Sequence, residues 1–89
     1  MTITEYIDGM AGIIRTTGAD VRIEDIDGKK RIAAKFPSVD AMRSEIKKAF
    51  TANMETLQAL NAGLKALRAS GYAPLVLERA IEYRMDFGF

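Results

Sequence analysis

The sequence predicts an α+β fold: one small domain in the order helix, β-hairpin, long helix and short helix, dimeric through the long helix. One observation behind this prediction is an Asp-Gly pair between two segments of alternating polarity, which is the signal of a tight β-hairpin. The other is the recurrence of apolar residues at steps of three and four on both sides of that hairpin, which is the period of amphipathic helices. Because 89 residues allow only one hydrophobic core, residues 1–89 are predicted to form a single domain.

The first helix is expected over about residues 3–16. Thr2 and Glu5 have the Thr-x-x-Glu spacing of a capping box, in which the two residues cap each other's backbone. Gly18 supplies a left-handed stop after the last turn. We expect this helix to bury one apolar face, made by Ile3, Tyr6, Ile7, Met10, Ile13 and Ile14.

The hairpin is expected over about residues 19–36. A type I′ turn needs positive φ at both central residues, which suits Asp27-Gly28, and it fixes the register of the two strands. That register places three acids opposite three bases, namely Asp20 with Lys35, Glu24 with Arg31 and Asp25 with Lys30. Each such cross-strand pair contributes about 0.2–1 kcal/mol, so the charges support the register that the turn sets.

A long helix is expected over about residues 39–69, with Ser38 as its N-cap. One apolar stripe keeps its direction throughout, which favours a continuous helix, and a break near residues 61–63 is the alternative. A helix of about 31 residues would be roughly 46 Å long, whereas a compact domain of this size is about 30 Å across. The helix should therefore overhang its own domain, which predicts a homodimer.

Asn53 lies inside this apolar stripe. A buried amide needs a hydrogen-bonding partner, so two roles are open. The side chain either fixes the register and oligomeric state of a helix seam or reaches a backbone carbonyl or solvent at a gap in the packing.

A second face of the long helix consists of small residues, and a helix that is apolar on two sides is normally buried on two sides. Small side chains let another helix approach closely. The sequence therefore predicts a self-association face, and the alternative is that the last helix of the same chain covers it. The residues concerned are Ala52, Ala59, Ala62, Gly63 and Ala66.

The last helix is expected over about residues 74–85, opened by Pro74 at its first turn. Leu77, Ala80, Ile81, Arg84 and Met85 would trace its inner edge. The C-terminal rings, which are Tyr83, Phe87 and Phe89, are expected in the core, and a docking tail for a partner is the alternative.

Charge is distributed unevenly along the chain. Residues 29–48 hold seven bases and two acids, whereas residues 1–28 hold two bases and six acids. This pattern allows local contact with an anionic ligand such as nucleic acid. Acidic residues on the first strand of the hairpin, however, neutralise much of the positive charge on its second strand. The candidate basic contact surface comprises Lys29, Lys30, Arg31, Arg43, Lys47 and Lys48.

Several chemistries are not expected. The chain has no cysteine and no histidine, which removes disulfides, thiolate metal sites and the commonest general base. We find no plausible nucleophile with a base, no phosphate loop and no EF-hand pattern, so neither catalysis nor a cofactor or metal is expected. The apolar runs are too short for a membrane span and no signal peptide is evident, so a cytoplasmic protein is expected.

The function expected from these features is non-catalytic binding of another macromolecule, most simply another protein. Small cysteine-free chains of this kind are typical of phage and bacterial regulators, inhibitors of host defence systems among them. Two other classes stay open: a nucleic-acid-binding protein that uses the basic stretch 29–48, and a structural subunit assembled through the small-residue face.

Overall fold

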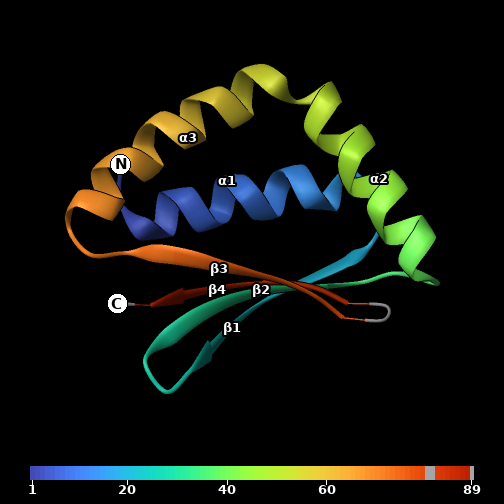
Figure 1. Ribbon diagram of the computed structural model, residues 1–89, viewed down its shortest axis with the longest axis horizontal. Coiled ribbons are helices and arrows are strands. Elements are labelled where there is room, and N and C mark those ends of the chain that lie inside the picture. Colours follow the sequence, from blue (N-terminus) through green and yellow to red (C-terminus); the bar gives the residue numbers. More distant parts are fainter. Residues whose placement is uncertain (80–81, 89) are drawn as a thin grey trace.

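The described helices, three in number, all lie on one face of a four-stranded antiparallel sheet in the computed structural model of the protein (Figure 1). The structure describes residues 1–79 and 82–88. The sheet has the strand order β1-β2-β4-β3, so β1 and β3 are its outer strands. The predicted α+β class and single small domain are confirmed. Along the chain the elements are α1 (Ile3–Arg15), β1 (Asp20–Ile26), β2 (Lys29–Lys35), α2 (Val39–Ala52), α3 (Met54–Ala69), β3 (Ala73–Arg79) and β4 (Glu82–Gly88).

Helix α1 begins with the predicted capping box. The Thr2 hydroxyl accepts a hydrogen bond from the Glu5 backbone N–H at 3.1 Å, and the Glu5 carboxylate accepts one from the Thr2 backbone N–H, also at 3.1 Å. The bond from the Thr2 backbone holds the pKa of Glu5 below its ordinary value, because it favours the ionised carboxylate. After the helix, Gly18 has a φ of 84°, a left-handed conformation that glycine adopts without strain.

The hairpin of β1 and β2 has the predicted register. Asp27 and Gly28 have φ values of 52° and 76°, as a type I′ turn requires. Lys30 Nζ lies 3.5 Å from Asp25 Oδ2, which confirms one of the predicted ion pairs. The other two predicted pairs also lie opposite each other across the strands: Glu24 with Arg31 and Asp20 with Lys35.

The prediction of one continuous helix over residues 39–69 is wrong, because the helix breaks at Asn53 into α2 and α3. Asn53 has φ −119° and ψ 32°, outside the helical region. Its side-chain Nδ2 donates a hydrogen bond to the Ala49 carbonyl at 2.7 Å, and its backbone N–H donates to the same carbonyl at 3.1 Å. A side chain that bonds the carbonyl four residues earlier bends a helix. Of the two roles expected for Asn53, the structure shows the bond to a backbone carbonyl.

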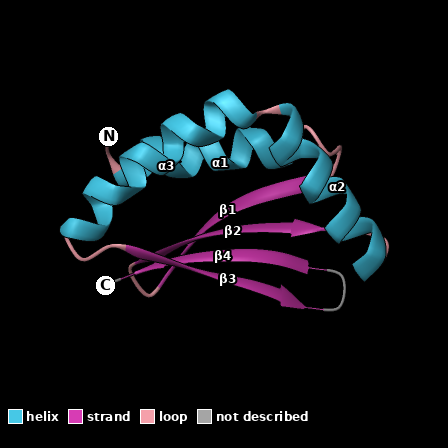
Figure 2. Cartoon of the chain, turned by 45° about the horizontal axis from the view of Figure 1, so that its top comes forward, coloured by secondary structure: helices cyan, strands magenta, loops and turns pink. Residues whose placement is uncertain are grey.

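The bend turns α3 back across α1, as both ribbon views show (Figures 1 and 2). The longest extent of the molecule is 35 Å, which is shorter than the roughly 46 Å of an unbroken helix. Neither α2 nor α3 alone is as long as the domain, so the overhang that was the reason for expecting a dimer is not present in these two helices.

The predicted helix over residues 74–85 is also wrong, because its described residues form the hairpin of β3 and β4. Strand β4 lies between β2 and β3, and Met85 pairs with Ile32 of β2. A helix here would leave the inner edge of β2 without backbone partners, whereas a strand satisfies both edges. Tyr83 is buried, which confirms core packing for this ring. Ala80, Ile81 and Phe89, which were assigned to the helix and to the aromatic end, lie outside the described residues.

Helix α1 is the centre of the core. It packs on β1 and β2 below and on α2 and α3 above, and its Ile7 and Ile14 are fully buried. Gly9 allows α3 to approach closely, because a Cβ at this position would lie 2.6 Å from Leu60 Cδ2. A Cβ at Gly12, one turn further along α1, would meet nothing within 4 Å.

These two glycines predict opposite results from the same substitution. Gly12→Ala should raise the free energy of unfolding by about 0.5–1 kcal/mol, because alanine is the better helix former and finds open space. Gly9→Ala should lose that gain, because overpacking against Leu60 costs about 1–3 kcal/mol. Urea denaturation of both variants beside the parent chain measures the difference. Equal stabilisation by the two substitutions would contradict the close packing of α1 on α3.

Candidate binding groove

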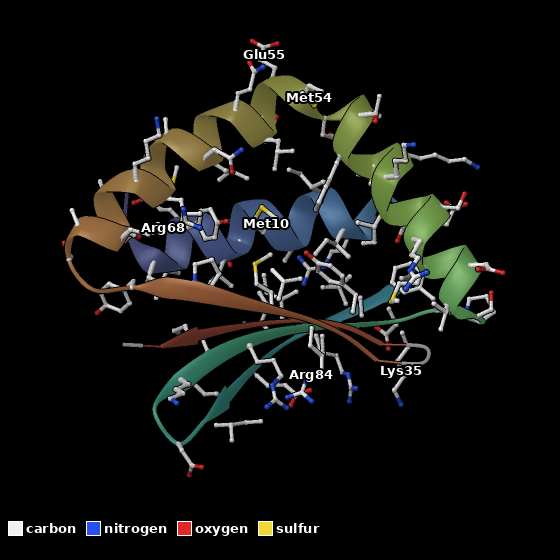
Figure 3. The ribbon with its side chains drawn as sticks, in the orientation of Figure 1. Met10, Lys35, Met54, Glu55, Arg68 and Arg84 are labelled. Carbon is white, nitrogen blue, oxygen red and sulfur yellow. The ribbon has the colours of Figure 1, made fainter. Side chains whose placement is uncertain are left out.

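An apolar groove of about 400 Å³ runs between α3 and the half of the sheet formed by β3 and β4. Residues from all three described helices and from these two strands line it. Figure 3 shows one of them, Met10, on α1 between α3 and the sheet. The lining is mainly apolar, as in sites that accept the side chains of a ligand. We call it the α3 groove and define it by the apolar residues Met10, Phe50, Leu57, Leu64, Val76 and Met85.

The groove follows from the way in which the helices cover the sheet. Helix α3 packs on α1 rather than on the strands, whereas α1 packs on β1 and β2, and α2 reaches β4. Val76 of β3 pairs directly with Met85 of β4, so the two side chains share one face of the sheet. Met85 is 4% exposed, whereas Val76 is 47% exposed. The helices therefore cover Met85 on β4 but not Val76 on the neighbouring strand β3, and this apolar side chain stays exposed at the border of the groove.

Polar groups lie at the end of the groove near the start of α1. Arg68 of α3 is the one charged side chain among the described residues that line it, and it is exposed (Figure 3). Tyr6 lies beside it, and burial raises the pKa of the Tyr6 hydroxyl while the positive charge of Arg68 acts in the opposite direction. The groove thus combines an apolar floor with a guanidinium, a group that binds carboxylates through paired hydrogen bonds.

The predicted self-association face lies on the outer side of α2 and α3. Ala52, Ala59, Ala62 and Ala66 are exposed, and Gly63 is half-buried. A Cβ at Gly63 would collide with the Met1 side chain, so the N-terminal residue lies against this part of the face. The alternative that a last helix of the same chain covers the face is wrong, because β3 and β4 occupy that part of the sequence.

The predicted basic residues fall into two groups at opposite ends of the sheet (Figures 1 and 2). One group is at the β1–β2 turn and comprises Lys29, Lys30 and Arg31; the other is on α2 and comprises Arg43, Lys47 and Lys48. Each group has a lysine in an ion pair, Lys30 with Asp25 at 3.5 Å and Lys48 with Glu45 at 3.6 Å. The structure does not bring the six residues together into one basic patch.

Among residues 1–79 and 82–88, no group of three or more acidic, histidine or cysteine side chains is placed to hold a metal ion. Within the same residues, no helix has both the length and the apolar character needed to cross a membrane.

Models of known protein families give no match to this chain, and a search of curated proteins gives no significant match either.

The position of Tyr6 predicts a pH dependence of stability. Its folded pKa lies above the value of about 10 that tyrosine has in unfolded chains, so the neutral side chain stabilises the fold below pH 10. This contribution is lost as the pH rises through the folded pKa. The Tyr6→Phe variant has no group that ionises at this position. In thermal melts recorded across alkaline pH, its melting temperature should therefore fall less than that of the parent chain as the pH rises above 10. The difference in tyrosinate absorbance between the two proteins reports the titration of Tyr6, and a midpoint at or below 10 would contradict its burial.

Proposed function

We propose that this protein is a non-catalytic protein-binding protein, a small regulator or inhibitor that holds a segment of another protein in the α3 groove. The observation that carries the proposal is Val76, an apolar residue that is 47% exposed beside the buried Met85 and borders an apolar groove. Apolar surface of this kind, concave and rimmed by polar groups, is typical of protein interaction sites.

The groove also indicates the chemistry of the partner segment. Its apolar lining suits one or two aliphatic or aromatic side chains, which become buried against Met10, Leu64 and Val76. The guanidinium of Arg68 at one end suits a carboxylate of the same segment. We therefore propose a partner segment in which an acidic residue lies close to an apolar anchor.

Nucleic-acid binding is a weaker proposal, because the basic residues are divided between the hairpin turn and α2. Assembly through the small-residue face of α2 and α3 is the third class, and its support is the exposure of Ala59, Ala62 and Ala66. These classes give different results in the following experiment.

The experiment is a pull-down of the tagged protein from a bacterial lysate, with and without nuclease, using two matched variants. Val76→Glu places a carboxylate in the groove, whereas Met54→Glu places one at the bend between α2 and α3, where Met54 is 48% exposed and outside the groove. Burying a carboxylate in an apolar contact costs more than the roughly 1.4 kcal/mol that lowers affinity tenfold. We expect a nuclease-resistant protein that Met54→Glu retains and that Val76→Glu releases, with both variants melting near the parent temperature.

The proposal is overturned by either of two outcomes. Complete release by nuclease would show that the captured material was held through nucleic acid. Equal capture by the parent chain and by Val76→Glu would show that the partner binds elsewhere. A third variant, Arg68→Glu, tests the partner chemistry, because it should weaken the capture of an acidic segment and leave a neutral apolar segment bound.

A further inference from the structure

The outer strand β1 presents an unusual combination of charges and apolar side chains. An outer strand has backbone N–H and C=O groups along one side that are available to another strand. Arg22, Ile23 and Ile26 of β1 are exposed, and the two isoleucines are each 39% exposed. The other outer strand, β3, contains Pro74, which lacks a backbone N–H and interrupts strand pairing. Strand β1 contains no proline, so it is the better edge for pairing.

The charged residues of β1 form pairs of opposite sign when the strand pairs antiparallel with β1 of a second copy. In an antiparallel pair of two β1 strands centred on Ile23, Arg22 of one copy faces Glu24 of the second copy, and Glu24 faces Arg22. Within one chain these two side chains already lie on the same face, with Arg22 Nη2 3.9 Å from Glu24 Oε1. The pair of copies would therefore form a square of four charges in which every neighbour has the opposite sign, while Ile23 packs against Ile23.

Other registers are less favourable. Residues that lie directly opposite each other in an antiparallel pair have their side chains on the same face of the sheet. Two identical strands related by a twofold axis can therefore pair only in registers in which one residue lies opposite its own copy. Centring on Arg22 or on Glu24 places like charges opposite each other, which is destabilising. Centring on Val21 also matches charges, Asp20 with Arg22, but it pairs only residues 20–22 of each strand, whereas centring on Ile23 pairs all of β1.

We propose that a second copy of this chain binds at β1, in an antiparallel pairing centred on Ile23 that joins the two sheets into one. The interface is a single strand pair and lies at the small end of specific interfaces, so the dimer is weak and forms at high protein concentration. This self-association differs from the one expected through the small-residue face, because it uses strand backbone and leaves α3 exposed.

Sedimentation velocity across a concentration series that reaches the millimolar range tests the proposal. The parent chain should change from monomer to dimer within the series. Arg22→Glu and Glu24→Arg should each remain monomeric, because each places like charges opposite each other. The double variant Arg22→Glu/Glu24→Arg restores opposite charges at both positions and should recover the dimer to within about tenfold of the parent affinity.

Matched controls distinguish this interface from others. Ile23→Lys should abolish the dimer, because the two lysines would face each other. Ile26→Lys should retain it, because Ile26 is equally exposed and its lysine would face Asp20 of the second copy. Ala59→Glu should also retain it, because this residue lies on the outer side of α3. Circular dichroism melts confirm that every variant is folded.

Several results would overturn the proposal. The first is a parent chain that stays monomeric throughout the series. A dimer that survives Glu24→Arg would have another register, such as the one centred on Val21. A dimer that is lost in Ala59→Glu and retained in Ile23→Lys would form through the small-residue face. Failure of the folded double variant to recover the dimer would show that the charges of β1 do not define the interface.

Discussion

The bend at Asn53 is the constraint on which the rest of the fold depends. The Ala49 carbonyl accepts hydrogen bonds from both the side chain and the backbone of Asn53, and the helix changes direction there. The change of direction lets α3 return across α1, where Leu60 packs into the space that Gly9 leaves. After α3 the chain enters the sheet as its outer strand β3, and β4 then takes the position between β3 and β2. The α3 groove is a consequence of the same path, because α3 rests on α1 and not on the outer strands.

The parts of the fold that could be predicted are those fixed by short-range chemistry. Asp27-Gly28 determines a turn type and therefore a register, and Thr2 with Glu5 determines a helix start. The long helix was predicted without its break because one residue of irregular backbone hardly changes the spacing of the apolar residues along the sequence. Asn53 itself was the available signal, since a polar residue in an apolar stripe needs a partner, and the nearest one is a carbonyl of the preceding turn.

The C-terminal hairpin and the groove were missed for different reasons. Residues 74–85 fit a helical period of apolar residues, and Pro74 suits the first turn of a helix as well as an outer strand. The alternation of apolar and charged residues over 82–88 was a strand signal that the helical pattern obscured. The groove has no local signal, because it depends on α1, α3 and β3 meeting in space. The small-residue face was predicted on one continuous helix, whereas the bend places Ala52 on α2 and the other four residues on α3. A sequence pattern also does not reveal whether a neighbour covers such residues.

The sheet order β1-β2-β4-β3 has a consequence for valency. The edge at β1 and the groove beside β3 lie on opposite borders of one sheet, so occupation of one leaves the other accessible. Two copies joined at β1 would carry their grooves at the two far ends of a continuous sheet. A partner that presents two copies of the same segment would then be held at both ends, and its second contact would form at a high effective concentration. A repetitive or dimeric target would then be held tightly even though each groove binds its segment with modest affinity.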